Sequence, residues 1–275
     1  MSKLRSLDLV KFSSLVLVLQ WSAMVHATDQ TPTEQESSES RTINDETRRE
    51  ERILQRHSPL YFAYGEPNSK LQLSFKSAVI RGFPLYMAYT QVMFWELNAE
   101  SKPFRDFTYA PELFYRMNLQ EVGWLKSVDF GLFGHNSNGK SGDASRSLDM
   151  NYLRFNFERE GRRWTTRFST QFAYLHGFDP GNNRIQDYVG PLTFSLTFIQ
   201  LFDSWLDKTM LTFSAAPGGK FAQDWDRGGY QVSWAFRLGG LDLIPAFYVQ
   251  YYYGYAETLL NFDQHNRELR VGLTL

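Results

Sequence analysis

The strongest constraint on the fold is an alternation of apolar and polar residues that runs through the chain from residue 59 onward. In residues 149–159, for example, Leu153, Phe155 and Phe157 are separated by single polar residues. Side chains of a β-strand point to opposite faces in turn, so this pattern gives each strand one apolar and one polar face. No segment with the period of a helix interrupts the pattern. The sequence therefore predicts an all-β domain over residues 59–275.

We predict twelve strands, and after the second strand their connections alternate in length. The strands are 60–65, 69–80, 84–97, 107–117, 124–137, 149–159, 163–176, 187–200, 207–215, 229–238, 242–254 and 267–275. The short links are 81–83, 118–123, 160–162, 201–206 and 239–241, and the longer ones are 98–106, 138–148, 177–186, 216–228 and 255–266. Short turns at one end, long loops at the other and an even strand number are typical of outer-membrane barrels.

Amphipathic strands would also suit a soluble barrel or a β-sandwich, in which the apolar faces point inward. The long strands and an aromatic content of 16% favour a membrane barrel instead. No apolar run reaches the roughly 18 residues that a transmembrane helix requires. The expected fold is thus a transmembrane antiparallel β-barrel of twelve strands, located in the bacterial outer membrane.

Residues 1–27 have the features of a secretory signal peptide. A basic start is followed by the apolar run 12–19 and by Val25-His26-Ala27, a small-x-Ala cleavage site. An uncleaved membrane anchor is the alternative, but eight apolar residues are too few to cross a bilayer. Export of the chain agrees with the outer-membrane location.

Residues 28–58 form a polar leader without aromatic residues, and they hold too little apolar surface to build a core. We expect a flexible or partly helical periplasmic segment in which His57 is solvated. The formal net charge of −1 gives no reason to expect a nucleic-acid partner. The absence of cysteine excludes both a disulfide framework and a thiolate site.

The candidate site lies where the strands 124–137 and 149–159 meet the loop 138–148. An antiparallel hairpin centred on residue 142 places His135 opposite Asp149 and Ser137 opposite Ser147. A hydroxyl nucleophile would then lie beside an imidazole base, and the base beside a carboxylate that can orient it. The other interpretation is an ordinary hairpin tip, where Ser, Asn, Gly and Asp are common because they suit turns.

The length of the connections places loop 138–148 at the outer membrane surface. Leu153 shares a strand face with Asp149, so Ser137, His135 and Asp149 should point toward lipid rather than into the lumen. Polar groups that face lipid are costly, which favours a role in chemistry on lipid. Residues 129 and 131 complicate this interpretation, because Asp129 and Gly131 would share the His135 face.

The motifs around this hairpin resemble the bacterial outer-membrane phospholipase A family. The matching pieces occur in order over about 60 residues, with a weaker match at residues 253–259. They are Tyr89-Thr90-Gln91, Trp95, Ser101-Lys102-Pro103-Phe104-Arg105, His135-Asn136-Ser137-Asn138-Gly139 and Ser145-Arg146-Ser147. The resemblance implies a twelve-stranded barrel that hydrolyses acyl esters of phospholipids and lysophospholipids, depends on Ca2+ and acts as a homodimer.

Carried over residue by residue, the resemblance makes Ser137 the nucleophile, His135 the base and the Gly139 amide an oxyanion donor. It implies that Ca2+ binds Ser145 and the Lys140 carbonyl, together with the Ser101 carbonyl of the second subunit. Asp143 is a further candidate ligand, since calcium prefers oxygen donors. Gln91 resembles a polar residue that the family buries in its dimer interface.

Two positions depart from the family. Asp149 stands where the family usually has Asn, and Gly142 stands where an acidic calcium ligand is common. A carboxylate can orient an imidazole at least as well as an amide, so we expect the activity to survive. The alternatives to a phospholipase are a non-enzymatic barrel, either a narrow pore or a structural protein, and an inactive member of the family.

Overall fold

The computed structural model describes residues 54–119, 123–179, 184–201, 206–239 and 245–275. The expected signal peptide, and the expected leader up to residue 53, lie outside the described residues. Residues from Glu50 to Leu275 belong to one compact unit, and the description that follows concerns this unit alone.

Within the described residues the secondary structure is almost entirely β. The strands are β1 (Gln55–Arg56), β2 (Tyr61–Tyr64), β3 (Ser69–Ile80), β4 (Phe83–Trp95), β5 (Phe104–Asn118), β6 (Leu125–Ser137), β7 (Ser147–Glu160), β8 (Thr165–His176), β9 (Leu192–Ile199), β10 (Leu206–Gly218), β11 (Asp224–Leu238), β12 (Ala246–Gly254) and β13 (Asn266–Thr274). Two short 3-10 helices, η1 (Gly142–Ala144) and η2 (Ile185–Asp187), lie in loops. In the described part of the chain, no helix is long and apolar enough to cross a membrane.

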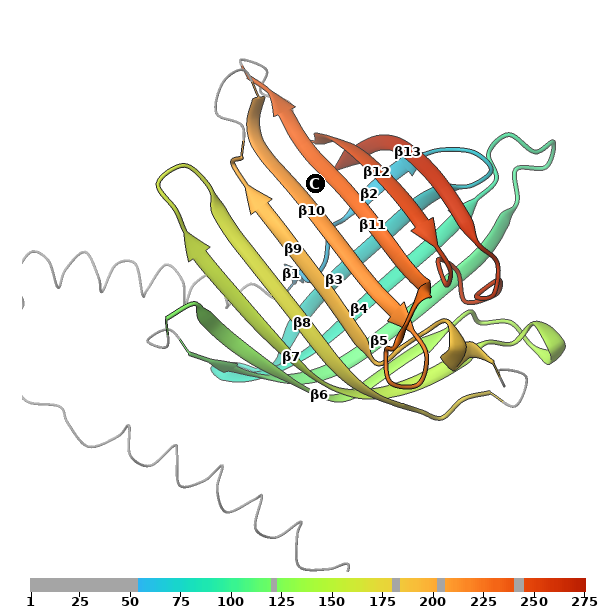
Figure 1. Cartoon of the computed structure of the whole chain (residues 1–275), viewed down its shortest axis with the longest axis horizontal. Coiled ribbons are helices and arrows are strands. Elements are labelled where there is room, and N and C mark those ends of the chain that lie inside the picture. Colours follow the sequence, from blue (N-terminus) through green and yellow to red (C-terminus); the bar gives the residue numbers. More distant parts are fainter. Residues whose placement is uncertain (1–53, 120–122, 180–183, 202–205, 240–244) are drawn as a thin grey trace, which may run out of the picture. The chain divides into compact units, whose positions relative to one another are not determined.

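Strands β2 to β13 form a closed antiparallel barrel (Figure 1). Each of them pairs with its neighbours in the sequence, and β13 closes the ring by pairing with β2, where Thr274 lies opposite Tyr61. The very short β1 pairs with β3 as well, on the side where β2 also pairs. The predicted twelve-stranded antiparallel barrel is therefore confirmed.

The predicted strand boundaries are wrong in two regions, at the start of β9 and around the β10–β11 connection. Residues 187–191 were expected to begin a strand, but η2 and a turn occupy this region and β9 starts only at Leu192. Pro191 explains the late start, since proline cannot donate to a β ladder. Conversely, most of the expected loop 216–228 is strand, because β10 continues to Gly218 and β11 begins at Asp224. These extensions are rich in polar residues and glycine and so carry no alternation.

The two faces of the barrel wall have opposite polarity. Large apolar side chains are exposed on the outer face, as in Leu73, Leu153, Phe172 and Leu269. Buried charged and polar side chains line the lumen. This is the arrangement expected of a barrel whose outer surface contacts lipid, and it is the reverse of a soluble barrel.

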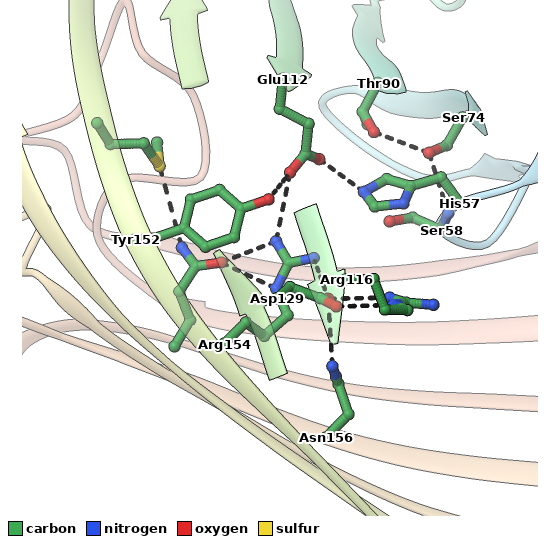
Figure 2. A network of polar contacts seen from close by, with 12 residues as sticks. His57, Ser58, Ser74, Thr90, Glu112, Arg116, Asp129, Tyr152, Arg154 and Asn156 are labelled. Carbon is green, nitrogen blue, oxygen red and sulfur yellow. Dashed lines mark hydrogen bonds and ion pairs between the residues drawn. The ribbon is translucent and has the colours of Figure 1, made fainter. Parts of the chain in front are cut away.

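A connected polar network lies inside the barrel (Figure 2). Glu112 on β5 lies at its centre: it contacts His57 at 2.6 Å and Arg154 at 3.6 Å, and it accepts a hydrogen bond from the Tyr152 hydroxyl. Asp129 on β6 accepts two bonds from Arg116, at 2.7 and 2.9 Å.

The environment of His57 corrects the sequence-based expectation. Its side chain is only 7% exposed, and the neighbouring Ser58 amide donates to the Ser74 hydroxyl at 3.0 Å. His57 is therefore a lumenal residue and not a solvated part of the leader. The contact could not be predicted from the sequence, because Glu112 lies 55 residues from His57 along the chain.

The long loops gather at one end of the barrel, where they pack on each other. A buried apolar cluster joins Leu148 at the start of β7, Ile185 and Tyr188 around η2, and Leu259 and Phe262 in the β12–β13 loop. Leu148 is fully buried in this cluster. It fixes the beginning of β7, and with it the position of the next residue, Asp149.

Candidate active site

A β-bulge in β6 decides which side chains of the site face outward. Gly131 pairs with Tyr152, but Gly134 pairs with Met150, so β6 has one residue more than β7 between these points. An extra residue shifts the alternation of faces by one. Asp129 therefore points into the lumen, whereas His135 points out of the barrel on the same face as Phe133. The bulge removes the conflict that the sequence left open at residues 129 and 131.

The predicted register of the hairpin is confirmed. His135 pairs with Asp149 and Ser137 pairs with Ser147. The Nδ1 atom of His135 lies 2.6 Å from Oδ1 of Asp149, with side-chain exposures of 34% and 29%. When Nδ1 donates its proton to the carboxylate, Nε2 keeps a free lone pair and can act as a base.

Ser137 lies two residues beyond His135 at the end of β6, so both side chains project from the same face. Its Oγ accepts a hydrogen bond from the Gly139 amide at 3.1 Å. Gly139 adopts a φ of +65°, and a Cβ there would lie 2.7 Å from the Tyr109 ring. Glycine at this position thus aims a backbone donor at the serine oxygen.

Asn138 holds the loop after Ser137 in a fixed shape. Its side chain is buried, donates to the Ala144 carbonyl at 2.8 Å and accepts from the Arg146 amide at 3.0 Å. Its own amide donates to the Arg146 carbonyl at 3.0 Å. Asn138 lies inside the motif that carries the resemblance, but its type and spacing alone predict no role for it.

The Ser145 hydroxyl contacts a carboxylate that sequence reasoning missed. Its Oγ donates to Oδ2 of Asp179 at 2.6 Å, and the Asp179 amide in turn lies 3.3 Å from the Ser147 carbonyl. Asp179 follows β8 in the next long loop, 34 residues from Ser145. Neither its spacing nor its neighbours in the sequence point to the site.

The remaining candidates occupy the same end of the barrel or its outer wall. The Lys140 ammonium donates to the Arg105 carbonyl at 3.1 Å, and Asp143 lies in η1, where its carbonyl accepts from Arg146 at 2.7 Å. Ser101 is exposed in the loop between β4 and β5. Gln91 lies on the outer face of β4 opposite Leu73 and accepts from the Tyr89 hydroxyl at 3.1 Å.

The loop that was expected to bind calcium offers several oxygen donors. The Ser145 hydroxyl and the Asp179 carboxylate already touch, and the carbonyl of Lys140 belongs to the same loop region. Among the described residues, no three acidic or histidine side chains converge as a metal site. A hard cation would therefore depend on hydroxyl, carbonyl and water oxygens beside one carboxylate, a donor set that fits calcium.

Taken together, these residues form a closed barrel with an apolar outer wall, the class of the outer-membrane β-barrels. Its outer face carries Ser137, His135 and Asp149, the side-chain types that a serine hydrolase uses. Comparison with known proteins agrees with this class. The family model described as Phospholipase A1 matches residues 18–275. The chain belongs to the phospholipase A1 family, and the resemblance inferred from its motifs is confirmed.

Among its relatives, Phospholipase A1 of Klebsiella pneumoniae is 29% identical over 224 residues, which are 75% of this chain and 69% of the relative. Phospholipase A1 of Escherichia coli K12 is also 29% identical and covers 75% of this chain and 68% of the relative. The solved structure of outer membrane phospholipase A from Escherichia coli superposes with a TM-score of 0.66 at 25% identity, covering 81% of this chain and 94% of that one. A Salmonella typhi outer membrane phospholipase, described as a dimer with bound calcium, has a TM-score of 0.67 at 24% identity, with 85% and 96% coverage.

Proposed function

We propose that this protein is a calcium-dependent phospholipase A that cleaves acyl ester bonds of phospholipids and lysophospholipids. The observation that carries the proposal is the position of Ser137, which lies beside a hydrogen-bonded His135–Asp149 pair on the apolar outer face. We propose that residues 59–275 form the catalytic barrel, preceded by a signal peptide at 1–27 and a leader at 28–58.

The chemistry follows from the roles of the three side chains. His135 Nε2 takes the proton of Ser137 as its Oγ attacks the ester carbonyl carbon, and Asp149 holds the imidazole in the required tautomer. The Gly139 amide donates to the oxygen on which negative charge develops. His135 then gives its proton to the departing glycerol oxygen, and water releases the fatty acid by the reverse sequence.

The surroundings of His135 suit a substrate that arrives from a bilayer. The exposed Phe133 ring lies parallel to the imidazole, with 6.4 Å between ring centroids, and Leu153 is exposed on the same outer face. An acyl chain could lie along this wall while its ester reaches Ser137. We place the site at the outer leaflet, because it lies among the long loops of an outer-membrane-type barrel.

The calcium part of the proposal assigns Ser145, the Lys140 carbonyl, Asp143 and Asp179 as sources of ligands. When bound, calcium would supply positive charge beside the developing oxyanion. The contact of 2.6 Å between Ser145 and Asp179 supports this role, because it brings oxygen donors together next to the start of β7.

We further propose that the active state is a homodimer. Gln91 is a polar side chain on an outer wall that is mostly apolar, and such a group is less costly against a second subunit than against lipid. The Ser101 carbonyl, exposed in the neighbouring loop, would then reach the calcium site of the other subunit. The relative that was crystallised as a dimer with calcium supports this assembly.

The test uses the purified full-length protein in detergent with mixed phospholipid micelles. We expect hydrolysis only with calcium, labelling of Ser137 by a fluorophosphonate probe, and a cross-linked dimer that increases with activity. Ser145→Ala should raise the calcium concentration needed for half-maximal activity without changing heat-modifiable gel mobility, which reports barrel folding. Full activity of a monomer in chelator would refute the calcium and dimer roles, and absence of labelling would refute the hydrolase.

A further inference from the structure

The Asp149 carboxylate is confined on the side opposite His135. In the β7–β8 pairing Asp149 lies opposite His176, the last residue of β8, and Gly177 follows directly. A Cβ built on Gly177 would lie 2.2 Å from Oδ2 of Asp149, 2.8 Å from its Cγ and 3.1 Å from its Cβ. Oδ1 is occupied by His135, so the second carboxylate oxygen rests against the bare Cα of a glycine.

A side chain at residue 177 could be accommodated only by moving the carboxylate or the end of β8. Asp149 has a short side chain on a strand that is paired on both sides, with β6 and with β8. Its carboxylate therefore has few positions from which Oδ1 reaches the imidazole. We propose that Gly177 is a positioning residue of the active site: its missing side chain leaves the space that lets Asp149 hold His135. This inference rests on the proposed hydrolase function.

Two other effects of a Gly177→Ala substitution must be separated from this one. Gly177 has a φ of +60°, where any side chain adds strain, and Asp179 of the proposed calcium site lies two residues further on. Gly82 provides a matched control for strain, because it has a φ of +72° with no atom within 4 Å of a Cβ, in the turn between β3 and β4. A calcium titration of each variant controls for the second effect.

The kinetic test is a double-mutant cycle on mixed micelles. We expect Gly177→Ala to lower kcat about 30-fold, while KM and the calcium concentration for half-maximal activity change less than about twofold. Gly82→Ala should leave kcat within about twofold of the wild-type value. In an Asp149→Ala background, Gly177→Ala should lower kcat by less than about a further twofold, since the group through which Gly177 acts is gone. An equal loss in both backgrounds, or full activity of Gly177→Ala, would overturn the inference.

A spectroscopic readout tests the same geometry without hydrolysis. A proton in a short charge-assisted hydrogen bond such as His135 Nδ1–H to Asp149 resonates well downfield in a proton spectrum of histidine-labelled protein. His135→Asn assigns the signal by its loss. We expect Gly177→Ala to remove it and Gly82→Ala to keep it. If the signal behaves in this way but wild-type protein hydrolyses nothing, the proposed function is wrong and the positioning role stands. Persistence of the signal in Gly177→Ala overturns the role.

Discussion

The barrel contains two histidine–carboxylate pairs with the same contact distance and different surroundings. In the lumen His57 lies 2.6 Å from Glu112, with side-chain exposures of 7% and 14%. On the outer face His135 lies 2.6 Å from Asp149, with exposures of 34% and 29%. The contact distance and the pairing of a histidine with a carboxylate are therefore the same in the lumenal pair and in the pair beside Ser137.

The difference lies in what else each carboxylate does. Glu112 also accepts from the Tyr152 hydroxyl and pairs with Arg154, so both of its oxygens have partners. A carboxylate in such a network stabilises the fold. Asp149 pairs with one imidazole, that of His135, and Ser137 follows two residues later on the same strand face. The outer pair is thus free to take part in a reaction at Ser137, while the lumenal pair belongs to a network that loses contacts when either member moves.

The first prediction concerns the outer pair. Ser137→Ala and His135→Ala should each lower phospholipid hydrolysis by about 10⁴-fold or more, and the double variant should lose little further, because the two residues act as a unit. Neither should change the unfolding free energy by more than about 0.5 kcal/mol, since both side chains lie on an exposed strand end. Hydrolysis rates and urea unfolding in micelles check this. A Ser137→Ala variant with wild-type activity would exclude it as the nucleophile.

The second prediction concerns the lumen. Glu112→Ala should lower the unfolding free energy by about 3 kcal/mol, because it removes one of the two carboxylates near Arg154 and the acceptor that His57 and Tyr152 share. Activity per folded barrel should stay within about twofold of wild type. Glu158→Ala is the matched control, since its pair with Arg167 is exposed and should contribute less than about 1 kcal/mol. Equal losses for Glu112 and Glu158 would mean that the lumenal network adds no stability.

The third prediction tests the departure at Asp149. Asp149→Asn should retain activity within about tenfold, or about 1.4 kcal/mol of activation free energy, because an amide oxygen can still accept from His135. Asp149→Ala should cost more, about 100-fold, since the imidazole loses its orienting partner. Rates of the three proteins across pH check this, and identical rates for Ala and wild type would remove Asp149 from the site.

The sequence predicted the outer pair but not the lumenal one, for a physical reason. His135 and Asp149 belong to one hairpin, so strand alternation and loop symmetry alone place them opposite each other. His57 and Glu112 meet across the lumen, and closure of the barrel, rather than local pattern, brings them together. The β6 bulge was also missed, because a single extra residue leaves no periodic signature beyond the adjacent apolar Leu132 and Phe133.

The last and smallest predicted effect concerns Glu257, a loop carboxylate buried at the long-loop end. It accepts from Arg270 at 2.6 Å and from Lys70 at 3.3 Å, and all three side chains are less than one-tenth exposed. Burial raises the pKa of Glu257, but the two cations lower it more, so its pKa in the fold lies below its usual value of 4.5. A depressed pKa means that the stabilisation is complete well above pH 4.5 and is lost as the pH falls through 4.5 toward the folded value.

As the pH falls below 4.5, the wild type should therefore lose unfolding free energy that Glu257→Gln does not lose, by at most about 1.4 kcal/mol per pH unit for one carboxylate. The difference between the two proteins isolates this carboxylate from the others that titrate in the same range. Urea unfolding of both proteins at half-unit pH steps gives the measurement. A constant difference across the range would mean that Glu257 is equally protonated in the folded and unfolded states. In that case the rise in the pKa of Glu257 caused by burial would balance the fall caused by Arg270 and Lys70.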